Sequence, residues 1–212
     1  MNNMEEKVYT HPYFGDMRYL IYVPEKYRAV PNAPLLVFLH GAGERGDDVS
    51  LVCRQAVPRY IAQSIKFPDA ITICPQCPTS YIWNDLVLFL KDLIETVIDE
   101  YRIDRTRVSL TGISMGGYGT WEMAMCYPEM FRKIAPVCGG GTPWRAERIQ
   151  AKIRAFHGDR DTVVPPESSY QMVDAAKRAG KDALLTVFHD VDHGSWDMAY
   201  LTTNVLEWLM ED

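Results

Sequence analysis

The sequence predicts an α/β domain built around a doubly wound, mostly parallel sheet, and three observations support this. Apolar runs of strand length alternate with helix-length amphipathic segments along the chain. Several runs, such as 35–39, are apolar at every position, which is typical of parallel strands covered on both faces. The 212 residues contain no repeat, linker or low-complexity stretch. We therefore expect one domain over residues 1–212, large enough for a substantial core.

The N-terminal half begins with a strand signal. Residues 17–23 alternate in polarity and are rich in aromatic and β-branched side chains, which indicates an edge-type strand ended by Pro24. The longest helix is expected at 84–101, where apolar residues recur at helical spacing and charged residues face outward. The elements predicted in this half are strands at 17–23, 35–39 and 70–74, a helix at 52–64 with a distortion at Pro58, and the helix at 84–101.

The C-terminal half continues the alternation. A helix over 168–179 is expected to end at Gly180, because glycine favours the left-handed conformation that closes helices. The strands predicted in this half are at 107–110, 131–138, 153–157 and 183–188, and the helices at 118–126, 144–149, 168–179 and 198–210. Ligands of such sheets bind outside the carboxyl ends of the strands. Functional residues are therefore expected in the loops that follow strands.

Composition and charge exclude several function classes. The formal net charge is −6 and no basic cluster is present, which argues against binding the phosphate backbone of a nucleic acid. The N-terminal residues lack the apolar core of a secretory signal, and apolar runs such as 86–90 are much too short to span a membrane. We therefore expect a cytoplasmic protein with no nucleic-acid partner and no membrane partner.

The cysteines do not predict a metal or redox site. Cys74 and Cys77 form a C-x-x-C pair, but Pro78 follows where a redox motif would open a helix. A metal site would need a second pair of ligands, and Cys126 and Cys138 lie twelve residues apart with no histidine near them in the sequence. Buried or loop thiols are the better interpretation. We expect no metal and no cofactor.

The centre of the chain carries Gly-x-Ser-x-Gly between a predicted strand and a predicted helix. A strand that reverses into a helix within a few residues forces Ser114 into a strained conformation, and a Cβ at Gly112 or Gly116 would crowd the turn. The hydroxyl then stands exposed above the sheet edge. The N–H of Met115, at the helix start, points where an oxyanion would form. We interpret this turn as a nucleophile elbow.

A second glycine-rich loop, residues 40–46, directly follows a predicted buried strand. Glycine lets a backbone N–H approach a ligand closely, and Ala42 or Gly41 is expected to supply the second oxyanion donor. A nucleotide phosphate loop is the competing interpretation. It fits poorly because Gly46 begins no clear helix and no Lys-Ser/Thr pair follows. The ring of His40 is expected to bond nearby backbone and hold the loop.

A serine nucleophile needs a base, and the elbow fold requires the chain order serine, acid, histidine. His193 fits this order, because it lies in a loop after the last predicted strand and a glycine follows it. His189, at the end of that strand, is the fallback. His157 ends an earlier strand and is expected to be packed, while His11 and His40 precede the serine.

The base needs an orienting acid, and two aspartates compete for this role in one loop. Asp161 is preferred, because the apolar residues after it let it project back toward the histidine while Asp159 shapes the turn. Asp159 is the main alternative. Asp190 and Asp192 are weaker ones.

Four stretches in order, 40–46, 112–117, 157–165 and 192–194, together resemble the α/β-hydrolase superfamily. More narrowly, they resemble its small carboxylesterases, which include feruloyl and acetylxylan esterase-like enzymes, dienelactone hydrolase relatives and predicted peptidases of the prolyl oligopeptidase type. The resemblance implies an α/β-hydrolase fold. The short connection 139–152 leaves no room for a large lid.

The resemblance also implies roles for individual residues. Ser114 would be the nucleophile, His193 the general base and then acid, and Asp161 its orienter. The N–H groups of Met115 and Ala42 would form the oxyanion hole. The implied function is a serine carboxylesterase that hydrolyses short-chain or aromatic esters of the acetyl or feruloyl type, with a small-molecule ester as its substrate.

An open cleft fits such substrates better than it fits long-chain lipids. Tryptophans near the carboxyl ends of strands are candidates to line it, although Trp83 fits equally well as a core aromatic beside a helix. The residues expected at the substrate are Gly41, Trp83, Trp144 and Trp196. A small serine peptidase, an acyl-protein thioesterase and a non-catalytic binding module on the same fold remain alternatives.

Overall fold

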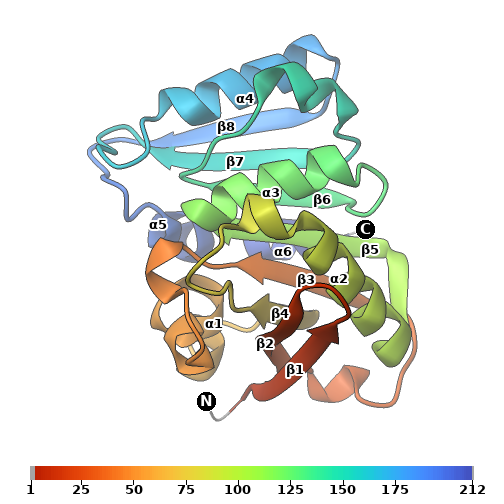
Figure 1. The fold of residues 1–212 in the computed structure, drawn as a ribbon. Coiled ribbons are helices and arrows are strands. Elements are labelled where there is room, and N and C mark those ends of the chain that lie inside the picture. The colour runs from red at the N-terminus through yellow and green to blue at the C-terminus, as the bar shows by residue number, and fades with distance from the viewer. Residues whose placement is uncertain (1–2, 212) are drawn as a thin grey trace.

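An eight-stranded sheet forms the centre of the structure, a computed structural model that describes residues 3–211 (Figure 1). The parts of the sequence predictions that involve Met1, Asn2 and Asp212 lie outside the described residues. The strands are β1 (Glu5–His11), β2 (Gly15–Tyr22), β3 (Ala33–Leu39), β4 (Ile71–Pro75), β5 (Ile103–Ile113), β6 (Lys133–Val137), β7 (Lys152–Gly158) and β8 (Ala183–Phe188).

The sheet is mostly parallel, as the sequence predicts. Its strand order is β1-β2-β4-β3-β5-β6-β7-β8. The pairs β1–β2 and β2–β4 are antiparallel, and the remaining five pairs are parallel. The parallel strands β3, β4 and β6 are buried at every position, because helices cover both faces of the sheet.

The α-helices divide between the two faces. They are α1 (Ala56–Ala62), α2 (Val87–Tyr101), α3 (Met115–Cys126), α4 (Glu167–Arg178), α5 (Trp196–Thr202) and α6 (Val205–Met210). Helices α2, α3 and α4 pack on one apolar cluster, and α1, α5 and α6 on the other. Alternate residues of β3 serve the two clusters: Leu35 and Val37 face the first, Leu36 and Phe38 the second. Figure 1 shows α2, α3 and α4 in front of the sheet.

The N-terminal strand was missed by the sequence interpretation. Residues Glu5–His11 form β1 at the sheet edge, so β2 is an inner strand rather than the predicted edge strand. Most side chains of β1 are exposed or half-buried, and several are charged. Charged residues protect an edge strand from pairing with other chains. They also remove the apolar alternation by which a strand is recognised in a sequence.

Several helix boundaries also differ from the predictions. Short 3-10 helices occur at Glu25–Tyr27, Ala42–Glu44 (η2), Val49–Arg54 (η3), Trp83–Leu86 and Pro143–Arg148 (η5). The predicted helix 52–64 is broken at Gln55 and not distorted at Pro58, which lies in the first turn of α1, where backbone N–H groups have no intrahelical acceptor. The predicted helix 198–210 is two helices, α5 and α6.

The carboxyl ends of the parallel strands place the candidate residues at one edge of the sheet. The loop 40–46 follows β3, Ser114 follows β5, Asp161 follows β7 and His193 follows β8. Between β6 and β7 only η5 interrupts the connection, so the absence of a large lid is confirmed for residues 139–151. None of the helices within residues 3–211 is long and apolar enough to cross a membrane.

Candidate active site

Ser114 stands at the sharp turn between β5 and α3. Its φ of 52° and ψ of −116° are strained for a residue with a side chain. A Cβ at Gly112 would lie 2.4 Å from the carbonyl oxygen of Gly116, and one at Gly116 would lie 1.9 Å from that of Leu39. Neither position can hold a side chain, which is the steric reason the sequence interpretation gave for both glycines.

The structure brings His193 and Asp161 into one hydrogen-bonded line with Ser114. Nε2 of His193 lies 2.8 Å from Ser114 Oγ, and Nδ1 lies 2.7 Å from Asp161 Oδ2. Because an ionised carboxylate only accepts hydrogen bonds, we assign the ring proton to Nδ1. Nε2 is then free to accept the serine proton. The side chain of Asp161 is fully buried, whereas that of His193 is one-fifth exposed.

Asp161 is held as a carboxylate by its surroundings. Its Oδ1 accepts hydrogen bonds from the backbone N–H groups of Val163 and Val164, both at 2.9 Å. Burial on its own would raise the pKa of Asp161, but the hydrogen bonds from His193, Val164 and Val163 outweigh burial and lower the pKa. The carboxylate therefore stays charged near neutral pH.

The two fallback residues bond each other. Nδ1 of His189 lies 2.7 Å from Asp159 Oδ2, and the His189 side chain is 84% exposed. This pair also fixes the turn, because Asp159 Oδ1 accepts the N–H of Asp190 at 2.8 Å. Asp159 thus shapes its loop, as the sequence interpretation expects.

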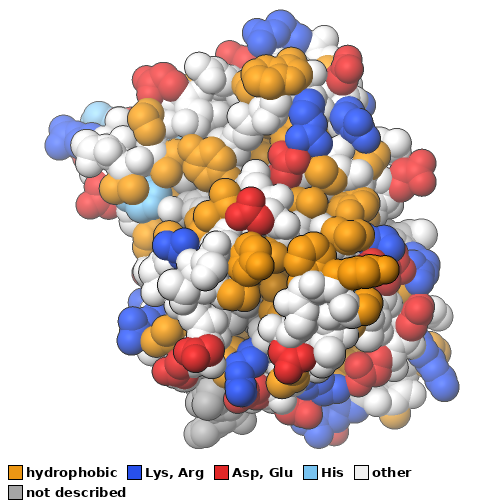
Figure 2. Space-filling model, viewed as in Figure 1, with side chains coloured by type: hydrophobic (Ala, Val, Ile, Leu, Met, Phe, Trp, Pro, Cys, Tyr) orange, Lys and Arg blue, Asp and Glu red, His pale blue; other side chains and the backbone are white. Residues whose placement is uncertain are grey.

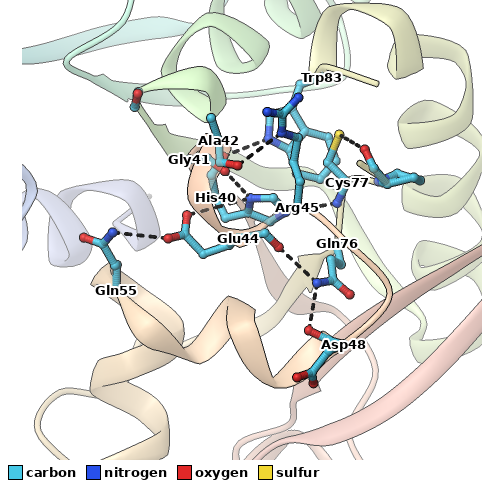
Figure 3. Close-up of polar contacts among 12 residues, drawn as sticks. His40, Gly41, Ala42, Glu44, Arg45, Asp48, Gln55, Gln76, Cys77 and Trp83 are labelled. Atoms are coloured by element: carbon cyan, nitrogen blue, oxygen red, sulfur yellow. Dashed lines mark hydrogen bonds and ion pairs between the residues drawn. The ribbon is translucent and has the colours of Figure 1, made fainter. Parts of the chain in front are cut away.

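His40 holds the loop after β3. The N–H of Cys77 donates to its Nε2 at 2.9 Å, so Nδ1 carries the proton and donates to the carbonyl oxygen of Gly41 at 2.5 Å. Trp83 Nε1 donates to the His40 carbonyl oxygen at 2.9 Å (Figure 3). Burial lowers the pKa of His40 to about 4, so the ring is neutral. The predicted structural role of His40 is confirmed.

Two more side chains pin this loop to the segment after β4. Gln76 Nε2 donates to the carbonyl oxygens of Glu44 and Asp48 at 3.0 and 2.8 Å (Figure 3). Arg45 donates to the carbonyl oxygen of Ala42 at 3.1 Å and reaches the carbonyl oxygen of Thr79 at 3.4 Å. Sequence reasoning missed the two contacts of Gln76 and the contact from Arg45 to Thr79, because they join segments about thirty residues apart.

The loop lies directly beside the nucleophile. A Cβ at Gly41 would lie 3.7 Å from Ser114 Cβ and 3.2 Å from Glu44 Oε2. Ala42 begins η2 and Met115 begins α3. The first N–H groups of a helix have no intrahelical acceptor, so neither amide is used within its own helix.

Glu44 is buried in this loop. Its side chain is 4% exposed, and Oε1 accepts a hydrogen bond from Gln55 Nε2 at 3.2 Å (Figure 3). Its Oε2 lies 3.9 Å from His40 Nδ1. The acid therefore belongs to the internal framework of the loop.

A solved structure of high similarity identifies the architecture. The chain superposes on a thermostable esterase with a TM-score of 0.87 and 34% sequence identity, covering 98% of this chain and 62% of that one. The chain has the α/β-hydrolase fold. The fold class predicted from the sequence is thus confirmed.

Sequence comparisons of the chain find proteins named as esterases. The chain is 27% identical over 169 residues to a bifunctional acetylxylan esterase/xylanase from Neocallimastix patriciarum, covering 76% of this chain and 23% of that protein. It is 28% identical over 157 residues to a probable feruloyl esterase C from Aspergillus oryzae, covering 71% and 57%. The chain spans less than two thirds of the length of each of these relatives. A model of the prolyl oligopeptidase family matches residues 141–212, which include Asp161 and His193 but not Ser114.

Two of the tryptophans expected at the substrate do not line an open cleft beside Ser114. Trp83 is fully buried between His40 and Gly119, where a Cβ on the glycine would lie 2.5 Å from the Trp83 side chain. It therefore supports the loop from below and lines no open cleft. Trp144 is 81% exposed and borders the C-terminal end of α4, around Arg178 and Ala179. Because α4 starts at the active edge and runs back across the sheet, Trp144 lies far from Ser114.

Trp196 is the tryptophan that lies at the site. Its ring stands edge-on to the ring of His193, with centroids 5.7 Å apart. It begins α5 and is partly buried. It thus limits the movement of the imidazole on one side.

Cys138 lies close to Asp161 and His193 in the folded protein, although the sequence did not predict this. It follows β6 with a φ of 41°. Its sulfur, a carboxylate oxygen of Asp161 and a ring nitrogen of His193 all lie within 4.8 Å of one another. Three such ligand types can hold a metal ion. Here burial raises the pKa of the Cys138 thiol to about 12, and the Asp161 oxygens already accept hydrogen bonds. The residues thus fit a buried thiol beneath the serine better than a metal site.

A surface hollow of about 440 Å³ lies at the opposite edge of the sheet. It is bordered by the C-terminal end of α3 and by α2, with Cys126, Tyr127 and Lys91 among its lining residues. It contains none of the three aligned side chains. On the face of the molecule shown in Figure 2, the Lys and Arg side chains are scattered among acidic and apolar groups and form no basic patch.

Proposed function

We propose that this α/β-hydrolase is a serine carboxylesterase, which cleaves short-chain or aromatic carboxylic esters through an acyl-enzyme on Ser114. The observation that carries the proposal is the hydrogen-bonded line from Ser114 through His193 to the buried Asp161. The esterase names of the similar proteins support the bond type. The catalytic roles of the three residues are part of this proposal.

The first half of the reaction acylates the serine. His193 Nε2 accepts the Ser114 proton while Oγ attacks the ester carbonyl carbon. Asp161 keeps the imidazole oriented and stabilises the positive charge that the ring acquires. The N–H groups of Met115 and Ala42 donate to the oxyanion, and the N-terminus of α3 adds partial positive charge there. The alcohol leaves with the proton that His193 returns.

The second half frees the acid. Water takes the place of the alcohol, His193 removes its proton, and the hydroxide attacks the acyl carbonyl. The same two amides hold the second oxyanion until the bond from the acyl carbon to Ser114 Oγ breaks, the acid leaves, and His193 returns the proton to Oγ. Loss of one such donor costs on the order of 10²–10³ in turnover in comparable enzymes.

The surroundings of Ser114 favour small soluble esters. The connection after β6 carries only the short η5, so no large lid is available to shelter a long acyl chain. The relatives named acetylxylan esterase and feruloyl esterase suggest acetyl or feruloyl groups as the acyl part. We include a cytoplasmic location and the absence of nucleic-acid and membrane partners in the proposal, supported by the acidic net charge and the unpaired cysteines.

A serine peptidase is the second candidate. The match of residues 141–212 to the prolyl oligopeptidase family model favours it, because this segment supplies two of the three aligned residues. The same triad cleaves amides when the site binds a peptide. An acyl-protein thioesterase uses the same residues as well.

A substrate panel separates these functions. The purified protein is offered p-nitrophenyl acetate, methyl ferulate, an acyl thioester and aminoacyl amides, and labelled with a fluorophosphonate. We expect ester hydrolysis to exceed amide hydrolysis by at least about 100-fold in kcat/KM, and Ser114→Ala to abolish labelling. Faster amide or thioester cleavage would replace the proposal with one of its alternatives. A native protein that neither labels nor turns over any substrate would be a binding module.

A further inference from the structure

His157 is the residue before last of β7, beneath the aligned residues, and is fully buried. Its Nε2 lies 3.1 Å from Asp161 Oδ2 and 2.9 Å from the carbonyl oxygen of Val164. Its Nδ1 lies 2.7 Å from Ser169 Oγ. Both ring nitrogens therefore have polar partners, although the sequence interpretation gave this residue only a packing role.

The proton on one ring nitrogen follows from these partners. An ionised carboxylate and a carbonyl oxygen can only accept hydrogen bonds, so Nε2 of His157 must be a donor. It donates toward the same Asp161 oxygen that accepts the Nδ1–H of His193. Two imidazoles thus bond Asp161 Oδ2, one on the side of the nucleophile and one from the interior.

Nδ1 of His157 connects the pair of His157 and Asp161 to the rest of the site through Ser169. Ser169 Oγ, on α4, also lies 2.9 Å from the carbonyl oxygen of Gly139, so its one hydroxyl proton has two acceptors, this oxygen and Nδ1 of His157. A Cβ at Gly139 would lie 2.6 Å from the backbone of Gly117, at the start of the elbow helix. His157 is therefore connected through α4 and the loop after β6 to the helix that carries Met115.

Packing alone does not explain a histidine at this position. Burying an imidazole costs the hydrogen bonds that it makes to water, and an apolar side chain would fill the same space without that cost. The cost is offset only because the described contacts engage both nitrogens. If the ring were removed, His193 would be the one donor left on Oδ2 of Asp161, while Oδ1 would keep the N–H groups of Val163 and Val164.

We propose that His157 is a positioning residue for Ser114, His193 and Asp161. Its Nε2–H holds the Asp161 carboxylate from the interior of the protein. This hydrogen bond also partly neutralises the negative charge on Oδ2, so that Asp161 attracts the His193 ring less strongly. This inference rests on the proposed function of Ser114, His193 and Asp161. His157 touches no substrate and acts through Asp161.

The charge effect has a definite sign. Without the donor from His157, Asp161 stabilises a protonated His193 more strongly. The base is then protonated at higher pH, and the acid limb of kcat/KM moves to higher pH. The titratable groups that face this carboxylate are His157, His193 and Cys138. The raised pKa keeps the Cys138 thiol neutral across the pH range of the measurement.

Two amide substitutions test the role of a single nitrogen. In His157→Gln the amide nitrogen reaches the place of Nε2 and can still donate to Asp161. In His157→Asn the shorter amide reaches only the place of Nδ1, so it can bond Ser169 but not Asp161. Both variants stay polar and smaller than histidine, which makes each the control for the other.

We expect His157→Asn to lower kcat on p-nitrophenyl acetate by about 10- to 100-fold. Losses of this size are typical when a residue that orients a directly acting residue through a hydrogen bond is removed. KM should change less than about threefold, and the acid limb should move upward. His157→Gln should restore most of kcat and the native pH profile. The rate of fluorophosphonate labelling should follow the same order.

A structural role alone would lower the folded fraction of both variants without separating their pH profiles. If the two folded variants have equal kcat and the same acid limb, or if Gln is the worse, the inference is wrong. The proposed function would still hold in that case, provided that the native protein hydrolyses the ester and Ser114→Ala does not. Absence of labelling and hydrolysis in the native protein would instead remove the proposed function and, with it, the inference.

Discussion

At the scale of single residues, the candidate site depends on which oxygen faces which nitrogen. Oδ2 of Asp161 accepts the Nδ1–H of His193, and this leaves Nε2 as the acceptor for Ser114. A change of one atom in the acid can reverse this arrangement, because an amide nitrogen donates where a carboxylate oxygen accepts. The tautomer of His193 is therefore the most sensitive property of the site.

The substitution Asp161→Asn tests this dependence. We expect kcat to fall by about 10⁴-fold with little change in overall structure, because the amide stabilises the wrong tautomer of His193. Initial rates on p-nitrophenyl acetate and circular dichroism measure the two effects. Asp159→Asn is the matched control, since Asp159 lies in the same loop, two residues before Asp161, but pairs with the exposed His189. Equal losses in both variants would contradict the assignment of Asp161.

The glycines of the elbow give a second residue-scale prediction. Gly116→Ala would place a Cβ 1.9 Å from the backbone oxygen of Leu39, which no side-chain rotation can relieve. We expect a loss of more than about 3 kcal/mol in the free energy of unfolding, measured with denaturant. Gly43→Ala is the control, because nothing lies within 4 Å of its Cβ position. A mild effect of Gly116→Ala would mean that the turn can relax.

At the scale of elements, the loop 40–46 is held in place by the segment after β4. His40, Gln76 and Arg45 each bond backbone across the gap between the two segments. Such bonds hold the loop that carries Ala42 in place, and the proposed function needs its amide fixed before substrate arrives. The loop therefore behaves as part of the rigid scaffold.

Removal of one of these bonds should affect the transition state more than the substrate complex. We expect Arg45→Ala to lower kcat by about 10-fold, which is less than the cost of losing an oxyanion donor, while KM changes little. Steady-state kinetics on a short aryl ester measure both constants. Arg54→Ala is the control, because Arg54 is exposed at the end of η3. A rise in KM with unchanged kcat would show that Arg45 serves binding instead.

The element scale also shows where sequence reasoning succeeds and where it fails. Buried strands such as β3 and β4 were predicted correctly, because residues covered on both faces must be apolar. β1 was missed because its polar side chains face water. The break at Gln55 was missed too, since the positive φ of Ala56 leaves no signature in an apolar run.

At the scale of the whole molecule, chain order predicted the candidate site and tertiary contacts completed it. The order of Ser114, Asp161 and His193 follows from the fold, so loops after strands were sufficient to find them. His157 and Cys138 lie behind these residues only because β6, β7 and α4 pack together. Trp83 and Trp144 were misplaced because sequence position near a strand end does not tell which way a side chain points.

The stability of the whole molecule should depend on the neutral state of His40. Its pKa is about 4 in the folded protein because of burial, against 6.5 for the exposed ring. Between these values the unfolded chain binds a proton that the native protein does not, so stability is fully present above pH 6.5 and is lost as the pH falls toward 4. At 1.36 kcal/mol for each pH unit, the loss between pH 7.5 and 4.5 amounts to about 2 to 3 kcal/mol.

Denaturant unfolding at these two pH values measures this contribution. His40→Asn removes the titrating ring, so the difference in stability between the two pH values should shrink by about 2 to 3 kcal/mol. A constant loss caused by the substitution cancels in that difference. If His40→Asn keeps the full acid sensitivity of the native protein, carboxylates such as Asp161 account for it, and the buried neutral ring does not limit stability.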